Sequence, residues 1–293
     1  MSNLSLYLAC VLIWGSTWIA ITFQLGQVPS ELSVAYRFGL GALILFGWCF
    51  ARKRPLYYGW PEHRGFMLSG ILMFGVNYVL VYYSEKFVSS GLVAVLFSTM
   101  VFANLFFARI FFRTAMRGEV AVGAVLGVAG IALIFWPEIA RFSHGGNALN
   151  GLGLGLLSVL TASLGNMVMV QNQRRGVPVV QANAFGMLYG AVAVLGYAAL
   201  MGMPLDFEAT PRYVVSLLYL AVFGSVLAFG AYMTLVRHIG PGPAGYTAVA
   251  IPVVALLIST LMESFQWHAI TFLGLALCLG GNVLVLRTER SRA

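Results

Sequence analysis

Residues Gly65 to Phe112 read GFMLSGILMFGVNYVLVYYSEKFVSSGLVAVLFSTMVFANLFFARIFF, and this stretch decides the fold. It holds two long apolar runs, Phe66–Ser84 and Gly91–Phe112, which a short polar segment at residues 85–90 separates. A helix of about 20 apolar residues crosses a hydrocarbon core about 30 Å thick. The stretch therefore predicts two transmembrane helices joined by a short polar turn.

Composition places the whole chain in the membrane. Sixty per cent of its residues are apolar and 9% are charged, whereas soluble domains have about 25% charged residues. The spans are expected to be helices, because a helix satisfies its own backbone groups in lipid. The alternating strands of roughly ten residues that are typical of outer-membrane barrels are not seen in the sequence. The sequence thus predicts an all-α integral membrane protein.

Ten apolar runs divide the chain into ten expected transmembrane helices. The expected spans are Leu4–Phe23, Leu32–Phe50, Phe66–Ser84, Gly91–Phe112, Val120–Trp136, Leu152–Gln171, Val179–Met201, Tyr213–Leu235, Ala244–Met262 and Ile270–Leu286.

The basic residues outside these spans set the expected orientation. With Arg109 at the end of the fourth span included, thirteen lie on the face that carries both termini and three (Lys86, Arg141 and Arg212) on the opposite face. Basic loops stay in the cytoplasm, so both termini are expected there. The net charge of +8 is explained by these loops, so we expect membrane lipid and no nucleic acid among the partners. The oligomeric state is left open.

The pattern of the opening stretch returns near Tyr213–Phe265, with His238 aligned on Lys86 at an offset of 152 residues. The fifth and tenth runs are both rich in glycine, and Pro29 and Pro178 precede the second and seventh. The chain therefore predicts a weak internal repeat.

Two five-helix repeats, residues 1–141 and 142–293, follow from this pattern within one membrane domain. An odd number of spans per repeat makes the second repeat enter the membrane from the opposite side, so the predicted fold is a 5+5 inverted repeat around a central cavity. Because the connections are short, we also expect each helix to lie beside the next one in the chain.

Polar and aromatic side chains near the middle of the spans are the candidate cavity residues, because polar groups inside a membrane usually face the interior. Tyr82 lies one turn beyond Tyr78 on the same face of its helix. The alternative for the polar residues is a hydrogen bond between helices, about 0.6 kcal/mol each, and for the tryptophans an interfacial belt. The candidates for substrate contact are Trp14, Thr17, Trp18, Asn77, Tyr78, Tyr82, Ser163, Asn166, Met167, Phe229, Tyr232 and Tyr246.

Arg37 is the basic residue placed clearly inside a span. We expect it to extend toward the outer surface, to Glu31 or a lipid phosphate, rather than to hold a substrate carboxylate. No acidic residue lies at the centre of a span, where a proton- or cation-coupled antiporter usually keeps one. This argues against a carrier of multidrug cations and leaves the driving force open. Several mid-membrane basic residues, which a phosphate or nucleotide-sugar carrier would need, are also missing. A neutral or zwitterionic solute with an apolar side chain fits better.

Two polar segments, one in each repeat, are candidate hinges. Gly240-Pro241-Gly242-Pro243 is expected to be non-helical, because glycine and proline both disfavour a helix. Pro252 leaves one carbonyl without its helical partner and is expected to kink its helix, although passive packing would explain it too. The candidate hinge residues are Ser89, Ser90, Gly91, Gly240, Gly242 and Pro252.

Enzymatic and metal-binding motifs are not found in the sequence. The cysteines (Cys10, Cys49 and Cys278) lie within apolar runs without metal-ligand spacing, which indicates packing residues. No nucleophile has a paired base, and the histidines form no ligand cluster. We therefore expect no enzyme activity, no metal and no cofactor, with a membrane-embedded enzyme kept as a distant alternative.

Several short motifs resemble the ten-helix EamA branch of the drug/metabolite transporter superfamily. They are Trp14-Gly15-Ser16-Thr17, Ala35-Tyr36-Arg37-Phe38, Ser89-Ser90-Gly91-Leu92, Leu96-Phe97-Ser98, and Pro252 with Met262-Glu263. Within that family the chain looks closest to the YddG-type aromatic amino-acid exporters. The family's usual proline in helix four is replaced near Thr99-Met100, and the glutamate that ends that helix is missing. We therefore expect the first repeat to bend differently from the second.

The resemblance implies a 5+5 inverted repeat, a central cavity, and export across a bacterial inner membrane. Together with the aromatic candidate cavity, it leads us to expect an exporter of small metabolites, aromatic or other apolar amino acids first, that works by alternating access. A broad-specificity drug or metabolite exporter is the alternative.

Overall fold

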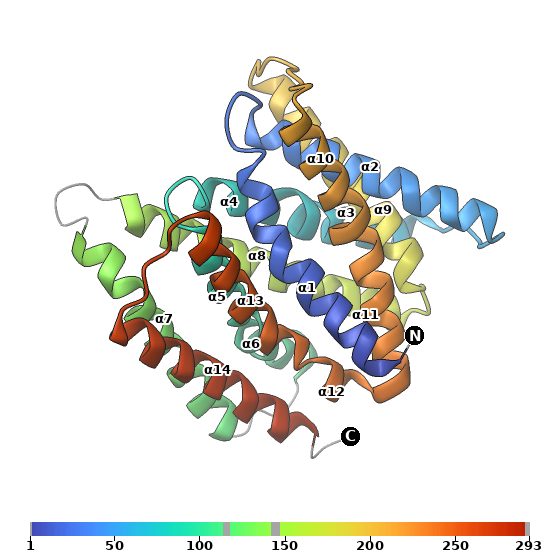
Figure 1. Ribbon diagram of the computed structural model, residues 1–293. Coiled ribbons are helices and arrows are strands. Elements are labelled where there is room, and N and C mark those ends of the chain that lie inside the picture. The colour runs from blue at the N-terminus through green and yellow to red at the C-terminus, as the bar shows by residue number, and fades with distance from the viewer. Residues whose placement is uncertain (1, 114–117, 142–146, 291–293) are drawn as a thin grey trace.

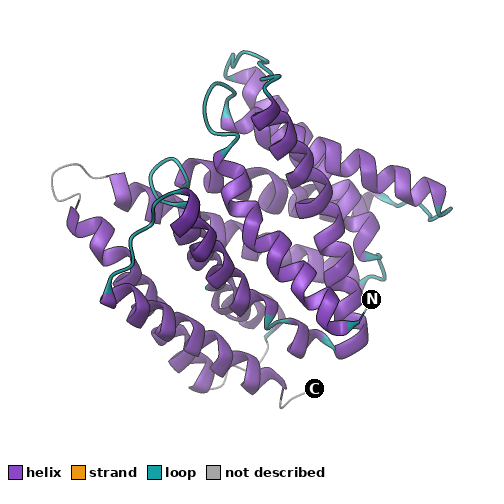
Figure 2. Ribbon diagram, viewed as in Figure 1, coloured by secondary structure: helices purple, strands orange, loops and turns teal. Residues whose placement is uncertain are grey.

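The computed structural model describes residues 2–113, 118–141 and 147–290, and within these ranges all regular secondary structure is helical (Figures 1 and 2). Eight helices are long and apolar enough to cross a membrane, and two shorter apolar helices, Ala121–Pro137 and Thr247–Met262, complete the ten predicted spans. The protein is an all-α integral membrane protein, as the sequence predicts. The N and C ends of the chain lie toward the same side of the molecule (Figure 1).

Six spans are single α-helices and four are divided into segments. The single helices are α1 (Asn3–Thr22), α2 (Ser30–Ala51), α7 (Gly118–Arg141), α8 (Asn147–Arg174), α9 (Val179–Leu200) and α14 (Ala269–Arg290). The third span is divided into α3 (Trp60–Gly70), η1 (Ile71–Val76) and α4 (Asn77–Ser84), and the fourth into α5 (Ser90–Ser98) and α6 (Met100–Phe112). The eighth span is divided into α10 (Pro211–Tyr219), η2 (Leu220–Leu227) and α11 (Ala228–Ile239), and the ninth into α12 (Pro241–Ala244) and α13 (Thr247–Met262).

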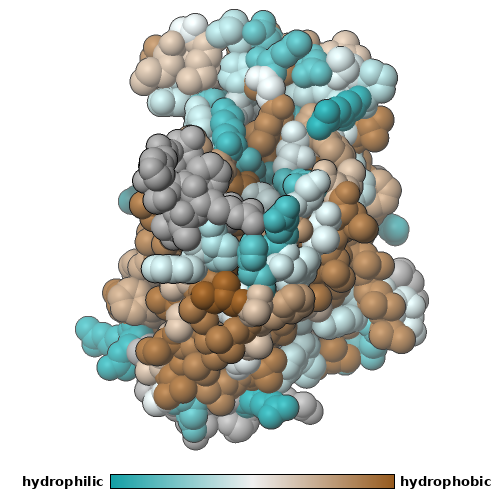
Figure 3. All heavy atoms as spheres, turned by 60° about the vertical axis from the view of Figure 1, so that its left-hand side comes forward, coloured by the Kyte–Doolittle hydropathy of each residue, from teal (hydrophilic) through white to brown (hydrophobic). Residues whose placement is uncertain are grey.

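Large apolar side chains remain exposed on the outside of this bundle, as lipid contact requires. Leu43, Val125 and Leu261 are among them. The space-filling view shows hydrophobic side chains over much of the lower part of one face, with hydrophilic ones gathered above them (Figure 3).

The third and eighth spans both contain a π-helical segment at the same place. Ile71–Val76 interrupts the third span and Leu220–Leu227 the eighth. In the eighth, the Ser225 hydroxyl donates to the carbonyl of Leu220, five residues back, at 3.0 Å. Because π-helical turns are rare and often mark functional sites, their recurrence in both halves supports the internal repeat.

The extensive helix contacts join the two halves of the chain. Among the described residues, α7 packs on α14 and α2 packs on α9, five spans apart in each case. The packing of α1 on α13 is matched by that of α8 on α6, and the packing of α1 on α11 by that of α8 on α4. Each of these helix contacts therefore has a counterpart in which both spans are replaced by the spans five places away in the chain.

The expectation that each helix lies beside the next one is therefore wrong for most spans. A short loop fixes only the adjoining ends of two helices, while their faces pack on the inverted repeat. Consecutive spans contact each other less than they contact helices of the other repeat.

Glycine makes the closest of these contacts possible. A Cβ atom on Gly130 of α7 would lie 2.5 Å from the carbonyl oxygen of Gly274 on α14, and one on Gly123 would lie 2.8 Å from that of Gly281. Small residues let helix backbones approach where lipid gives no hydrophobic drive between helices. This explains Gly123, Gly130, Gly274 and Gly281 of the fifth and tenth spans.

The first repeat bends differently from the second, as the sequence predicts. The fourth span breaks at Thr99 without a proline, where the Thr99 hydroxyl donates to the carbonyl of Leu96 at 2.6 Å and that of Ser98 to Val95 at 2.7 Å. Such bonds compete with the helical ladder. In the ninth span, α13 continues through Pro252.

The prediction that Gly240-Pro241-Gly242-Pro243 is not helical is wrong for most of that segment. Pro241–Ala244 form the single turn α12. Proline fits the first turn of a helix, where its missing N–H group has no partner to lose. Gly240, with φ +84°, separates this turn from α11.

Replacing Gly274 with alanine should destabilise the protein, because the new methyl group would meet the backbone of Gly130 at 2.6 Å. We expect a lower midpoint of thermal unfolding in detergent. Gly280→Ala is the matched control on the same helix, because a Cβ atom there meets nothing within 4 Å. Alanine favours a helix by about 1 kcal/mol over glycine, so the control should be unchanged or more stable. Equal midpoints for the two variants would contradict the close contact.

Candidate functional site

An aromatic group from α1 and α11 lies where the first helix meets the second repeat. The Trp14 ring lies 5.2 Å from Phe229, edge on, and 5.5 Å from Tyr232. Its Nε1 donates to the carbonyl oxygen of Gly224 at 3.2 Å. All three rings are half-buried. The structure thus brings these three predicted residues together.

Trp18 and Thr17 have different surroundings. The Trp18 ring lies 4.9 Å from Phe97 of α5, and its buried Nε1 has no hydrogen-bond partner. Thr17 is buried and donates to the carbonyl of Trp14 at 2.8 Å, and its methyl group fills the space beside Gly224. Thr17 is therefore in a packing position, whereas Trp18 is half-buried.

Arg37 lies inside the protein beside the two predicted tyrosines. Its guanidinium carbon lies 4.6 Å from the ring of Tyr78 and 5.0 Å from that of Phe38. Its Nε donates to the hydroxyl of Ser225 at 3.4 Å, and its buried Nη1 has no hydrogen-bond partner. A guanidinium over aromatic rings is stabilised by their electron-rich faces.

The expectation that Arg37 extends outward to Glu31 or lipid is wrong. Arg37 is 2% exposed, and Glu31 instead accepts a hydrogen bond from Tyr83 at 2.6 Å. Its partner Ser225 lies 188 residues away in the chain, so local sequence gave no signal of this direction.

Tyr82 and Asn77 are more buried than residues that line an open cavity. Tyr82 is fully buried and donates to Oε1 of Gln24 at 2.6 Å. Asn77 shares a helix face with Ser84, which bonds to the carbonyl of Gly151 on α8 at 2.7 Å. The Asn77 amide donates to the carbonyl of Met73 at 3.0 Å, and its Oδ1 has no partner. Tyr78 is half-buried.

A second polar group joins α6 and α8. The Ser163 hydroxyl donates to Oδ1 of Asn104 at 2.7 Å, and Nδ2 of Asn166 lies 3.5 Å from the same oxygen. Met167, the next predicted residue, is buried. Asn104 was missed from sequence, although an amide within the apolar run of the fourth span is the same signal that singled out Asn166.

Tyr246 lies apart from these groups. It begins α13, its side chain is half-buried, and its carbonyl accepts a hydrogen bond from Tyr7 at 3.3 Å. Its backbone thus connects α13 with the start of α1.

Glu263 connects the two repeats at one end of the molecule, in a contact that we name the Glu263 latch. Its carboxylate accepts from the backbone N–H of Ser90 at 3.1 and 3.2 Å, and from the hydroxyl of Ser259 at 2.6 Å. The Ser90 hydroxyl donates to it as well. A carboxylate at the N-terminus of a helix, here α5, satisfies free N–H groups and complements the helix dipole. In the sequence, Glu263 stands out only in the Met262-Glu263 motif, which does not predict its contact with Ser90.

Gly91 lets α5 approach α13 beside the latch. A Cβ atom on it would lie 2.9 Å from Cβ of Ser259 and 3.0 Å from Cα of Leu256. Ser89 precedes α5, and its buried hydroxyl has no partner. The predicted hinge at Ser89–Gly91 is thus tightly packed in this conformation, and hinge motion there stays a prediction.

Glu85 is the least expected group of the site. It follows α4 directly, is 7% exposed, and neither of its carboxylate oxygens has a hydrogen-bond partner among the residues that the structure describes. Burial, and then the negative charge of Glu263, raise the pKa of Glu85 well above its usual value, while Arg37 opposes the rise. The sequence predicts only a short polar turn at this position.

The two ends of the bundle are closed to different degrees. Nearly every residue of α5 is buried, whereas no residue of α6 is. Among the described residues α5 packs on α13, α1 and α8, while α6 packs chiefly on α8. At the repeat offset of 152 residues, Glu263 corresponds to Phe111 and Ser90 to Gly242. The second end therefore has neither the carboxylate nor the hydroxyl of the latch.

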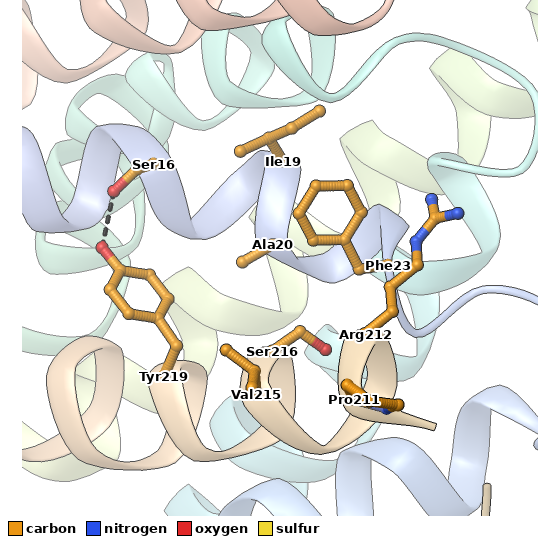
Figure 4. A pocket seen from close by; sticks show the side chains of 9 residues that line it. All are labelled: Ser16, Ile19, Ala20, Phe23, Pro211, Arg212, Val215, Ser216 and Tyr219. Atoms are coloured by element: carbon orange, nitrogen blue, oxygen red, sulfur yellow. Dashed lines mark hydrogen bonds between the residues drawn. The ribbon is translucent and has the colours of Figure 1, made fainter. Parts of the chain in front are cut away.

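A surface groove of about 440 Å³ opens between α1 and α10 (Figure 4). Its lining is largely apolar, Arg212 stands at one end over the ring of Phe23, and at the other end Ser16 and Tyr219 are bonded at 2.6 Å. None of the predicted substrate residues lines it. It runs along α1 of the first repeat and α10 of the second.

Comparison with known proteins gives consistent results. The model of the EamA-like transporter family matches residues 1–136 and 149–287. "Uncharacterized inner membrane transporter YedA" of Escherichia coli (strain K12) is 30% identical over 94% of this chain and 88% of its own length. "Uncharacterized transporter YoaV" of Bacillus subtilis (strain 168) is 26% identical over 93% of both chains. A solved crystal structure has the same fold, with a TM-score of 0.71, 17% identity, and coverage of 100% of this chain and 99% of that one.

Glu263→Ala should open the end of the molecule that the latch holds, because α5 loses its acceptors on the second repeat. Hydrogen bonds to charged groups contribute about 1.5–3 kcal/mol, so the equilibrium constant for closing this end should fall roughly tenfold or more. We would measure the reaction of Phe97→Cys, beside Trp18, with a membrane-impermeant maleimide in intact cells. The native cysteines are buried, so background labelling should be low.

Ser264→Ala is the control, because Ser264 is the exposed neighbour of Glu263. It should leave the labelling rate unchanged. If the Glu263→Ala variant is labelled by the maleimide at the same rate as the parent protein, the latch does not hold this end closed.

Proposed function

Because this chain belongs to the EamA-like transporter family, we propose that it exports small metabolites, aromatic or other apolar amino acids first, by alternating access. It is a membrane transporter rather than an enzyme. The proposal concerns the substrate, the direction and the mechanism of transport.

The half-buried aromatic group of Trp14, Phe229 and Tyr232 is the observation that carries the substrate class. It joins α1 to the second repeat, and aromatic faces favour flat apolar side chains by burial and by ring contact worth about 0.5–1.5 kcal/mol. Tyr78, half-buried under Arg37, adds a ring beside a fixed positive charge. That charge favours a solute with a carboxylate over a cationic drug.

Alternating access is supported by the unequal ends of the bundle. The latch end is closed through α5, while α6 diverges from α13 at the other end. We propose that residues 1–141 and 142–293 are the two units that move, and that the looser end is the cytoplasmic one, as the thirteen-to-three distribution of basic residues indicates. The described conformation would then be the inward-facing one, in the inner membrane of a bacterium with both termini in the cytoplasm.

A broad-specificity exporter is the second candidate. Met100 is half-buried where the fourth span breaks, and methionine adapts to ligands of different shape. Aromatic walls are also less selective than hydrogen-bonding ones. A panel of amino acids and uncharged aromatic drugs would separate the two candidates.

Purified protein in liposomes should transport phenylalanine or tryptophan, and Tyr78→Ala and Trp14→Ala should each slow transport. Loss of one aromatic contact of about 1–1.5 kcal/mol corresponds to roughly fivefold to tenfold. Tyr82→Ala should also impair transport, through loss of a buried ring and of its bond to Gln24. Trp136→Ala, 61% exposed on α7, is the control and should transport normally. No amino-acid flux by the parent protein would refute the substrate class.

Replacing Gly240 and Gly242 with alanine should slow transport severalfold while the amount of protein in the membrane stays the same. Gly240 has φ +84°, where a side chain is strained by about 1 kcal/mol or more, and it joins α11 to α12. Gly176→Ala is the matched control, because Gly176 also has φ +84° but lies between α8 and α9. Equal transport rates for the two variants would rule out a special role for the Gly240 segment.

A further inference from the structure

Glu85 is a buried acid that neither packing nor hydrogen bonding explains. It lies just beyond the membrane-spanning part of the third span, and its carboxylate has no donor among the described residues. An ionised carboxylate buried without partners is very unfavourable, and such groups usually become neutral instead.

The charged and ionisable groups around Glu85 come from several elements. Arg37 of α2 and Glu263 after α13 act on it directly, and Tyr82 of α4 lies on its own helix and within its field. Lys86 is turned away, with its ammonium 4.4 Å from the ring of Tyr83. Glu31 is bonded to the hydroxyl of the same Tyr83. Arg37 is directed at Ser225 and Tyr78, so it makes no close ion pair with Glu85.

The two acids at this end have different surroundings. Glu263 accepts hydrogen bonds from Ser90 and Ser259, and its negative charge acts on Glu85. Glu85 receives no hydrogen bond from the described residues. A buried carboxyl group that lacks donors and faces a second carboxylate is stabilised in its protonated form.

We propose that Glu85 is a proton-binding site, and that its carboxylate takes up one proton from the outer water when the Glu263 end of the protein closes. The inference rests on the proposed alternating-access function. In the step, one O–H bond forms on a carboxylate oxygen of Glu85, the proton comes from hydronium, and no other covalent bond changes.

The direction of the pH dependence follows from linkage. In the closed form the pKa of Glu85 is raised, and in an open form water would return it toward the usual value of 4.5. The closed form therefore binds more protons than the open form at pH values between the two. Closure is favoured at low pH and is lost as the pH rises through the closed-state pKa, tenfold per pH unit for one proton.

The test measures the distance between two spin labels at this end of the full-length protein. Gln27→Cys lies in the loop after α1, and Gln266→Cys follows α13 in the second repeat; both positions are exposed. In detergent without substrate, we expect the ratio of short to long distances to fall as the pH is raised from 5 to 9. Glu85→Gln, a neutral mimic of the protonated acid, should keep the short distance at every pH. Glu85→Asp should restore a pH response.

Asp206→Asn is the control, because Asp206 is an exposed acid on a loop at the same face, and it should respond as the parent protein does. No pH response in the parent protein would overturn the proposal without need of any variant. A response that survives in Glu85→Gln would overturn it too. Because no substrate is present, failure of the amino-acid assignment in liposomes would leave this result unaffected.

Discussion

The close approach of helix backbones between the two repeats is the constraint on which the rest of this structure depends. In lipid there is no hydrophobic drive between helices, so association relies on packing and on a few polar contacts. The contacts of Gly130 with Gly274, and of Gly70 with Gly186, bring backbones to distances that exclude any side chain. These contacts fix α7 on α14 and the third span on α9, and so determine which faces are left to form an interior.

Polar contacts then distinguish one end of that interior from the other. Glu263 ties α5 to the second repeat, and the corresponding positions Phe111 and Gly242 cannot do the same at the opposite end. Arg37 and Glu85 lie buried near the tied end with unsatisfied atoms. Such groups are costly to bury, and the molecule keeps them where the two repeats meet. A symmetric fold thus carries an asymmetric set of charges.

The sequence predicted the ten spans well, because the length of an apolar run and the thickness of a membrane decide them. It also singled out Trp14, Phe229 and Tyr232, whose rings lie together in the structure, and predicted that the two repeats bend differently. It did not predict helix neighbours, because contacts such as α2 on α9 depend on how the repeats interlock. The direction of Arg37 depends on Ser225, and the burial of Glu85 on Glu263, each far away in the chain. The helical turn at Pro241–Ala244 does not follow from the glycine and proline content of the segment, because that content disfavours a helix while the first turn of a helix tolerates proline.

The π-helical segments of the third and eighth spans have a further consequence for how this protein can change. A π-helical turn accommodates one more residue than an α-helical turn, and one residue turns an α-helix by about 100°. The rotation of α4 about its helix axis, which decides where its side chains face, is therefore independent of the rotation of α3. The same holds for α11 and α10. If either segment relaxed to a regular α-helix, the side chains beyond it would rotate to new neighbours while the first half of the span stayed in place. A helical-wheel projection drawn through a whole span would misassign which residues share a face.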